Sequence, residues 1–202
     1  MVVGLLDEAL EALEQYDAEL AAIVVADDDR IDGRYLEVHQ GVLSLLARQA
    51  PVAGDLRLVA ALLHLVKHLE RIGDQCTNIA KMVPLLGHQP PTDSEITDRI
   101  RAMGAQARSQ VRQARQSFAL RDPELALDLS RQDDTIDAMN REIFRRAIDI
   151  GGEDADMREW AMSMVLVSRA LERIGDNAVD IGEQTVFVVT GLFRELGEER
   201  AR

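Results

Sequence analysis

The chain has 202 residues and a formal net charge of −13, and hydrophobic residues make up 47% of it but aromatic residues only 3%. The charge argues against a nucleic-acid binder, because phosphates repel such a protein before any contact forms. A single cysteine, Cys76, leaves no intrachain disulfide framework and no thiolate zinc cluster.

Long segments of helical period lie between the prolines and glycines, and Leu, Ala, Val, Ile and Met dominate their apolar positions. The expected helices cover, in chain order, residues 2–15, 18–49, 52–86, 94–120, 123–150 and 155 to beyond Phe193. No basic signal-peptide region precedes the first helix, and no apolar run approaches the roughly 20 residues of a membrane span, so we expect a cytoplasmic protein.

An internal repeat organises these helices. The hexapeptide LERIGD occurs at 69–74 and again at 171–176, and the acidic segment 28–32 matches 133–137. The sequence therefore predicts an all-α fold of six helices in two tandem three-helix bundles, over residues 1–87 and 92–202. By the same alignment Met1 matches Gln106, so the first helix is expected to be about a dozen residues shorter than its counterpart.

The repeat carries paired carboxylates. Residues four apart share one helix face, and the two acidic pairs of each half lie about twenty residues before and after the predicted turn, so antiparallel helices bring them to one height. The pairs are Asp28/Asp32 with Glu70/Asp74, and Asp133/Asp137 with Glu172/Asp176. Four facing carboxylates need a counter-cation or raised pKa values.

A multivalent metal is the simplest counter-cation, and carboxylates without His or Cys suit Mg, Mn, Ca or Fe better than Zn or Cu. The alternative is that the acids form ion pairs with neighbouring basic residues such as Lys67 and Arg169. Four acidic pairs in matched register favour the metal site.

With LERIGD after Asp-Leu-Arg, and Asp-Asp-x-Ile-Asp in the preceding helix, the chain resembles the PhoU family, accessory regulators of the phosphate-specific transport system. The resemblance implies two three-helix bundles whose acidic pairs hold multinuclear metal clusters of divalent or trivalent ions, iron above all, with Mg, Mn, Ca and Zn left open. It also implies negative regulation of phosphate uptake and of the phosphate-starvation response. The implied partners are the ATPase subunit of the phosphate ABC transporter and a sensor histidine kinase.

Three function classes follow. The first is a metal-binding regulatory adapter that is no enzyme, binds no nucleic acid and reaches the membrane only through its partners. The alternative is a carboxylate-ligated metal or iron storage bundle, although the Glu-x-x-His motif of di-iron bundles is absent from the chain. The third is a metal-free scaffold. We expect a homodimer, because apolar helix faces often remain on small bundles.

Other residues have structural interpretations. His64 and His68 point away from Glu70 on the helical wheel, which favours a solvated or interface role over metal binding. Cys76 and Trp160 are expected in the core. Four arginines between Arg101 and Arg115 share one face, which is either solvated or docks an acidic partner or anionic lipid.

The two repeats differ after LERIGD. The family pattern often continues with further acidic or amide residues, and the second copy has Asp180 and Glu183, which the resemblance adds to the metal ligands. The first copy has Asn78 and Lys81 at the matching positions. Lys81 places a cation where the family usually has a carboxylate.

The second site should therefore bind metal more tightly than the first, because no ammonium group competes with the ion there. Metal titration of Glu172→Ala and Glu70→Ala checks this, and the larger loss of affinity is expected for Glu172→Ala. A larger loss for Glu70→Ala would contradict the ranking.

Overall fold

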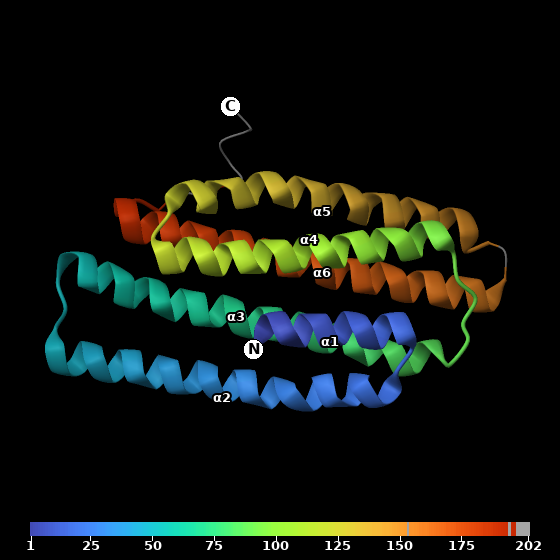
Figure 1. Cartoon of the computed structure of the whole chain (residues 1–202), viewed down its shortest axis with the longest axis horizontal. Helices are drawn as coiled ribbons and strands as arrows, with labels where there is room; N and C mark the ends of the chain where they lie inside the picture. The colour runs from blue at the N-terminus through green and yellow to red at the C-terminus, as the bar shows by residue number, and fades with distance from the viewer. Residues whose placement is uncertain (153, 194, 197–202) are drawn as a thin grey trace.

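The computed structural model describes residues 1–152, 154–193 and 195–196, and within them the protein consists of six helices and no strand (Figure 1). The helices are α1 Val2–Gln15, α2 Ala18–Gln49, α3 Ala53–Leu86, α4 Ser94–Leu120, α5 Pro123–Ile150 and α6 Ala155–Thr190. The predicted all-α class and the six-helix repeat are confirmed.

Aspartate side chains fix where four of the helices begin. Asp17, Asp93, Asp122 and Asp154 each accept hydrogen bonds from backbone N–H groups of the first turn of the helix that follows. These N–H groups have no partner within the helix, so each cap satisfies donors that are otherwise free. α3 differs, since it begins after Val52 without a side-chain cap.

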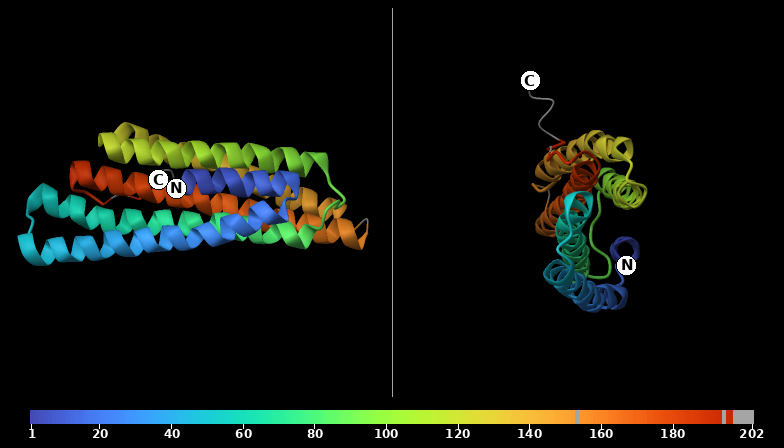
Figure 2. Two further views of the ribbon diagram at one scale, coloured as in Figure 1. Left: turned by 60° about the horizontal axis from the view of Figure 1, so that its bottom comes forward. Right: turned by 90° about the vertical axis from the view of Figure 1, so that its left-hand side faces the viewer.

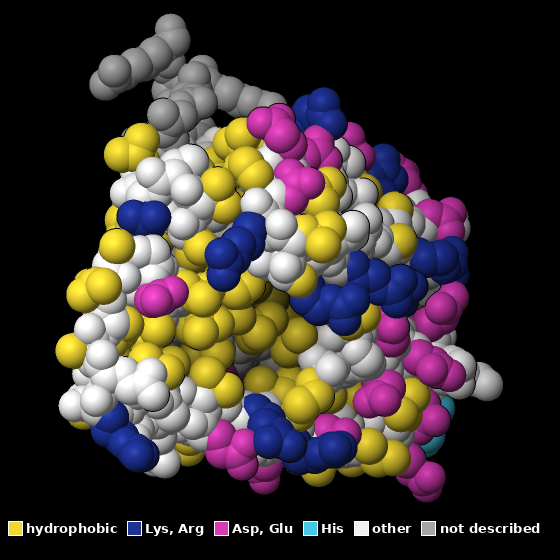
Figure 3. Space-filling model, turned by 60° about the vertical axis from the view of Figure 1, so that its left-hand side comes forward, with side chains coloured by type: hydrophobic (Ala, Val, Ile, Leu, Met, Phe, Trp, Pro, Cys, Tyr) yellow, Lys and Arg dark blue, Asp and Glu magenta, His cyan; other side chains and the backbone are white. Residues whose placement is uncertain are grey.

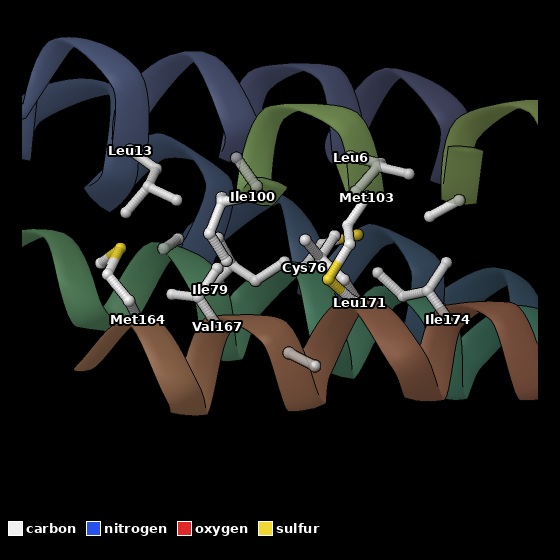
Figure 4. Packing of buried hydrophobic residues seen from close by; sticks show 14 of the residues in the cluster. Leu6, Leu13, Cys76, Ile79, Ile100, Met103, Met164, Val167, Leu171 and Ile174 are labelled. Atoms are coloured by element: carbon white, nitrogen blue, oxygen red, sulfur yellow. The ribbon is translucent and has the colours of Figure 1, made fainter. Parts of the chain in front are cut away.

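The helices lie side by side along the long axis of the molecule, α1–α3 on one side and α4–α6 on the other (Figures 1 and 2). α3 and α6 pack against one another and join the two halves. One cluster of buried hydrophobic residues contains members from both halves, with Cys76 and Ile79 of α3 near Leu171 and Ile174 of α6 (Figure 4). The predicted core positions of Cys76 and Trp160 are confirmed, at 0% and 2% exposure.

α1 is the shortest helix, with 14 residues against 27 in α4. Acidic residues on α1 pair with the arginine face of α4: Arg101 contacts Glu14 at 2.9 Å, and Arg108 contacts Asp7. The predicted arginine face therefore docks an acidic surface, but for Arg101 and Arg108 that surface belongs to the same chain. Ion pairs this exposed contribute about 0–1 kcal/mol each, so apolar packing holds most of α1 in place.

An apolar hollow of about 460 Å³ opens beside the N-terminal end of α1 (Figure 3). Its walls include Ile31 and Val38 of α2, Leu65 and Leu69 of α3, and Phe118 of α4. In the second half, the longer α4 packs against both α5 and α6. No helix in the described part of the chain is both long and apolar enough to cross a membrane.

The expected end of the last helix is wrong, because α6 stops at Thr190 and not beyond Phe193. Gly191 has a φ of 76°, the left-handed conformation that ends helices and that glycine adopts without a steric penalty. The chain then turns back, and the ring of Phe193 stacks on that of Phe187 with 4.1 Å between centroids. The glycine cap therefore ends the helix, and the stacked rings hold the chain that follows against it.

Leu6→Ala should lower the free energy of unfolding by about 2–5 kcal/mol, because Leu6 on α1 is fully buried and its removal leaves a cavity. Urea denaturation followed by circular dichroism measures the change. Leu36→Ala on α2 is the control, since Leu36 is 54% exposed and should change stability by no more than about 0.5 kcal/mol. Equal losses for both variants would show that α1 is not packed into the core.

Candidate metal centre

The structure brings the predicted acidic pairs together in each half. We define the first acidic cluster as Asp28 and Asp32 of α2 with Glu70 and Asp74 of α3. The second acidic cluster is Asp133 and Asp137 of α5 with Glu172 and Asp176 of α6. Within each cluster, acids from one helix raise the pKa of an acid on the other, as Asp32 does for Asp74 and Asp176 does for Asp133. The helical register inferred from the repeat is therefore correct.

A glycine lets the helices approach closely at each cluster. A Cβ atom added to Gly73 of α3 would lie 2.9 Å from Oδ1 of Asp28, and one added to Gly175 of α6 would lie 2.6 Å from Oδ1 of Asp133. Any larger residue would push these carboxylates away. An isoleucine also lies beside each glycine. Cδ1 of Ile31 would lie 3.0 Å from the Cβ added to Gly73, and Cδ1 of Ile136 would lie 3.2 Å from the Cβ added to Gly175.

Burial and mutual repulsion perturb the second acidic cluster most. Burial, followed by repulsion from Asp176 and Asp137, raises the pKa of Asp133 to about 7. Burial and the charge of Glu172 raise the pKa of Asp176 to about 6. Both shifts mean that ionising these carboxyl groups together is costly unless positive charge is supplied.

The pKa values of two acids in the first acidic cluster are also raised, but a nearby lysine opposes the shift. Burial raises the pKa of Asp28 and that of Asp74, and neighbouring carboxylates add to both shifts. Lys81 acts in the opposite direction on both groups. The lysine that the sequence places after the first LERIGD therefore lies close enough to neutralise part of the charge of this cluster.

The residues fit a hard metal ion. Oδ1 of Asp28 and Oδ1 of Asp133 are buried and make no hydrogen bond of regular geometry, an arrangement that costs free energy unless a donor or cation satisfies the oxygen. Thr77 and Gln110 lie close enough to lower the pKa of Asp28 and Asp133 respectively. The remaining acids supply further oxygens at the partly exposed edge of each cluster, the donor set that Mg, Mn, Ca and Fe ions accept. Each site combines an inner, buried carboxylate with outer, more exposed ones.

Three acids of the two clusters form ion pairs with basic neighbours. Oε2 of Glu70 lies 2.6 Å from Nζ of Lys67, Oε2 of Glu172 lies 2.6 Å from Arg169, and Oδ2 of Asp137 lies 3.5 Å from Arg141. Ion pairs of the kind that the alternative predicted are therefore present at these three acids. As the side chains stand, no three acidic, His or Cys groups among the described residues converge closely enough to hold a metal ion. Coordination requires the glutamates to leave pairs that are worth about 1 kcal/mol or less.

Asp180 and Glu183, which the family pattern adds to the metal ligands, have other contacts. Asp180 lies 3.2 Å from Nδ1 of His68, across the contact of α6 with α3. Glu183 accepts a hydrogen bond of 2.8 Å from the backbone N–H of Leu196. The expected interface role of His68 is confirmed, since Nδ1 also lies 3.0 Å from Oδ1 of Asn177, and His64 is exposed.

Gln110 of α4 is a residue of the second acidic cluster that the sequence did not indicate. Its side chain is fully buried, and Oε1 lies 2.9 Å from the Cβ position of Gly175. A glutamine at a core position of an amphipathic helix was the available signal. It was missed because the acidic pattern occupies only the second and third helices of each half.

Comparison with known families finds the PhoU domain twice, over residues 1–83 and 100–185. The chain is 31% identical over 192 residues to the phosphate-specific transport system accessory protein PhoU homolog of Clostridium acetobutylicum, covering 95% of this chain and 87% of that one. It is 33% identical over 195 residues to the homolog of Pseudomonas putida, covering 96% and 76% of the two chains.

Solved structures agree with this match. The crystal structure of PhoU from Pseudomonas aeruginosa superposes with a TM-score of 0.89 at 30% identity, covering 95% of this chain and 91% of that one. The phosphate transport system regulatory protein PhoU from Streptococcus pneumoniae has the same fold, with a TM-score of 0.87 at 24% identity and coverage of 96% and 90%.

Metal-free protein should lose stability as pH rises from about 4 to about 7. The folded pKa values of Asp133 and Asp176 lie above the ordinary value of 3.8, so the folded state holds protons that the unfolded chain has released. The stabilisation is fully present below the unfolded pKa and is lost as pH passes the folded pKa. Urea denaturation at about pH 5 and about pH 8 in chelator measures the slope.

Asp133→Asn should flatten this slope, because it removes the most strongly perturbed carboxyl group while it keeps its size. Asp29→Asn is the matched control, since Asp29 is exposed on α2. A slope in Asp133→Asn that equals that of the parent would show that the second acidic cluster does not carry the effect.

Proposed function

The chain belongs to the PhoU family, and on this premise we propose that it is a metal-binding regulatory adapter of phosphate uptake. Its relatives are named accessory proteins of the phosphate-specific transport system, which supports a role in the regulation of phosphate transport. The observation that carries the metal-binding part is the duplicated cluster of four acids, in which Oδ1 of Asp28 and Oδ1 of Asp133 are buried without a hydrogen bond of regular geometry.

Each half would hold its metal with the four acids of its cluster, Asp28, Asp32, Glu70 and Asp74 in one and Asp133, Asp137, Glu172 and Asp176 in the other. Asp180 and Glu183 join the second set only if they release His68 and Leu196. Hard divalent or trivalent ions match these oxygens, and the family resemblance favours iron. The bound charge would offset the repulsion that raises the carboxyl pKa values.

The adapter role gives the protein two kinds of partner. We propose that it contacts the ATPase subunit of the phosphate transporter and a sensor histidine kinase in the cytoplasm, and that it lowers both uptake and the starvation response when phosphate is plentiful. Membrane association then occurs only through the transporter. A homodimer is part of the proposal, and exposed apolar side chains such as Leu43 on α2 and Ile148 on α5 offer surface for it.

A carboxylate-bound iron store is the competing function. It requires turnover of iron with oxygen, whereas an adapter needs only bound metal. Iron-loaded protein that consumes oxygen in proportion to the iron added would favour storage. Elemental analysis of protein purified without chelator separates both ideas from a metal-free scaffold, since the scaffold contains no stoichiometric metal.

Tagged wild-type protein should co-purify with the transporter ATPase subunit and the histidine kinase from phosphate-replete cells, and with less of either from starved cells. The double variant Asp28→Asn/Asp133→Asn should lose metal and recover less of both partners, because each cluster loses its inner carboxylate. Mass spectrometry of the eluates measures recovery. Asp29→Asn/Asp156→Asn is the control, because these acids are exposed outside the two clusters.

Recovery of neither partner under either condition would overturn the adapter role. Equal recovery by wild type and by a metal-free double variant would leave the adapter role standing, but it would refute the proposed dependence on metal.

A further inference from the structure

A fully buried amide lies on α4 without a hydrogen bond of regular geometry. Gln110 is 0% exposed, and neither Oε1 nor Nε2 meets the distances and angles of a regular hydrogen bond in the part of the chain that the structure describes. The side chain nevertheless lies within reach of Asp133 and lowers the pKa of that carboxyl group as a hydrogen-bond partner. Buried amides are nearly always hydrogen-bonded, because an unpaired one loses its contacts with water and gains nothing in return. A leucine of similar size would fill this position at lower cost, so the amide group itself needs an explanation.

The amide points into the second acidic cluster. The Cβ position of Gly175 lies 2.9 Å from Oε1 of Gln110 and 2.6 Å from Oδ1 of Asp133, so both oxygens face the same glycine from different helices. Oδ1 of Asp133 is itself buried without a hydrogen bond of regular geometry. The two ends of an amide have nearly the same shape, so the amide can turn its N–H group to this carboxylate or its oxygen to a cation held by it.

The first acidic cluster has no counterpart to this amide. The repeat aligns Gln110 with Leu5 of α1, which is 5% exposed and lines a small cleft with Asp27 and Ile31 of α2. A leucine cannot bind a cation. The first helix of each half therefore offers an amide to the second cluster and only hydrocarbon to the first cluster.

We propose that Gln110 of α4 is a ligand of the second metal centre, where its amide oxygen completes the coordination begun by the carboxylates of α5 and α6. The inference rests on the proposed metal-binding function and deepens it. A neutral oxygen adds a ligand without adding repulsion, which suits a hard cation with six or more oxygen ligands. The two centres are then unequal, with the tighter one in the second half.

The test isolates one centre at a time. In an Asp28→Asn/Asp32→Asn background only the second cluster can bind, and Mn²⁺ titration followed by electron paramagnetic resonance measures its affinity. Gln110→Leu, which copies Leu5, should weaken Mn²⁺ binding by roughly 10- to 100-fold, the usual effect of removing a group that supports a metal site. Ser117→Ala is the control, because Ser117 is a buried polar residue of α4 that hydrogen-bonds Thr185 instead.

Gln110→Glu separates coordination from hydrogen bonding. Glutamate keeps an oxygen at the same reach but has no N–H group to donate. A ligand role predicts that Gln110→Glu retains at least the parent affinity, whereas a role as donor to Asp133 predicts a loss like that of Gln110→Leu.

Folding is checked with metal removed. The thermal midpoint of Gln110→Leu in chelator should equal or exceed that of its parent, because leucine removes an unsatisfied amide. Parent affinity in Gln110→Leu, or joint loss in the leucine and glutamate variants, would overturn the inference while metal binding stands. Absence of Mn²⁺ binding in the wild type would overturn the metal function itself.

Discussion

Apolar packing between long helices forces together carboxylates that repel one another. Glycines allow α3 to approach α2 closely and α6 to approach α5 closely. The acids that lie beside Gly73 and Gly175 therefore cannot move apart along the helix axes. Burial, to which repulsion from neighbouring carboxylates adds, raises the pKa of Asp28 and of Asp133. Buried apolar surface across α3 and α6 supplies the free energy that sustains this close approach.

The two halves differ in how they balance the negative charge of their acidic clusters. Lys81 brings positive charge to the first acidic cluster. In the second half Glu183 stands at that position and accepts a hydrogen bond from the turn after α6, and Gln110 adds a buried amide. The second half therefore retains a larger uncompensated negative potential, consistent with a pKa of about 7 for Asp133. Gene duplication preserved the helical frame and allowed the two centres to differ.

Contacts between the halves link the centres to each other. His68, two residues before the first cluster's Glu70, lies against Asp180 and Asn177, which follow Asp176 on α6. α3 and α6 share a continuous apolar seam along the same contact. A change of side-chain position at one centre can therefore shift the packing of the helix that carries the other.

The sequence by itself determined the helices, the repeat and the acidic register. Helical period, aspartate N-caps and glycine or proline breaks act within a few residues, so local reasoning found the C-terminal ends of five of the six helices. The spacing of four about the turns placed Asp28 opposite Asp74 and Asp133 opposite Asp176. Only the tertiary structure decided which groups outside this pattern reach the clusters. Four features illustrate this: the burial of Gln110, the pairing of Arg108 with Asp7, the contact of His68 with Asp180 and the fold-back of Phe193. The first three join segments far apart in the chain, and the last depends on a glycine cap. Such contacts depend on the angle and depth at which helices pack, and no periodicity along a single helix encodes either.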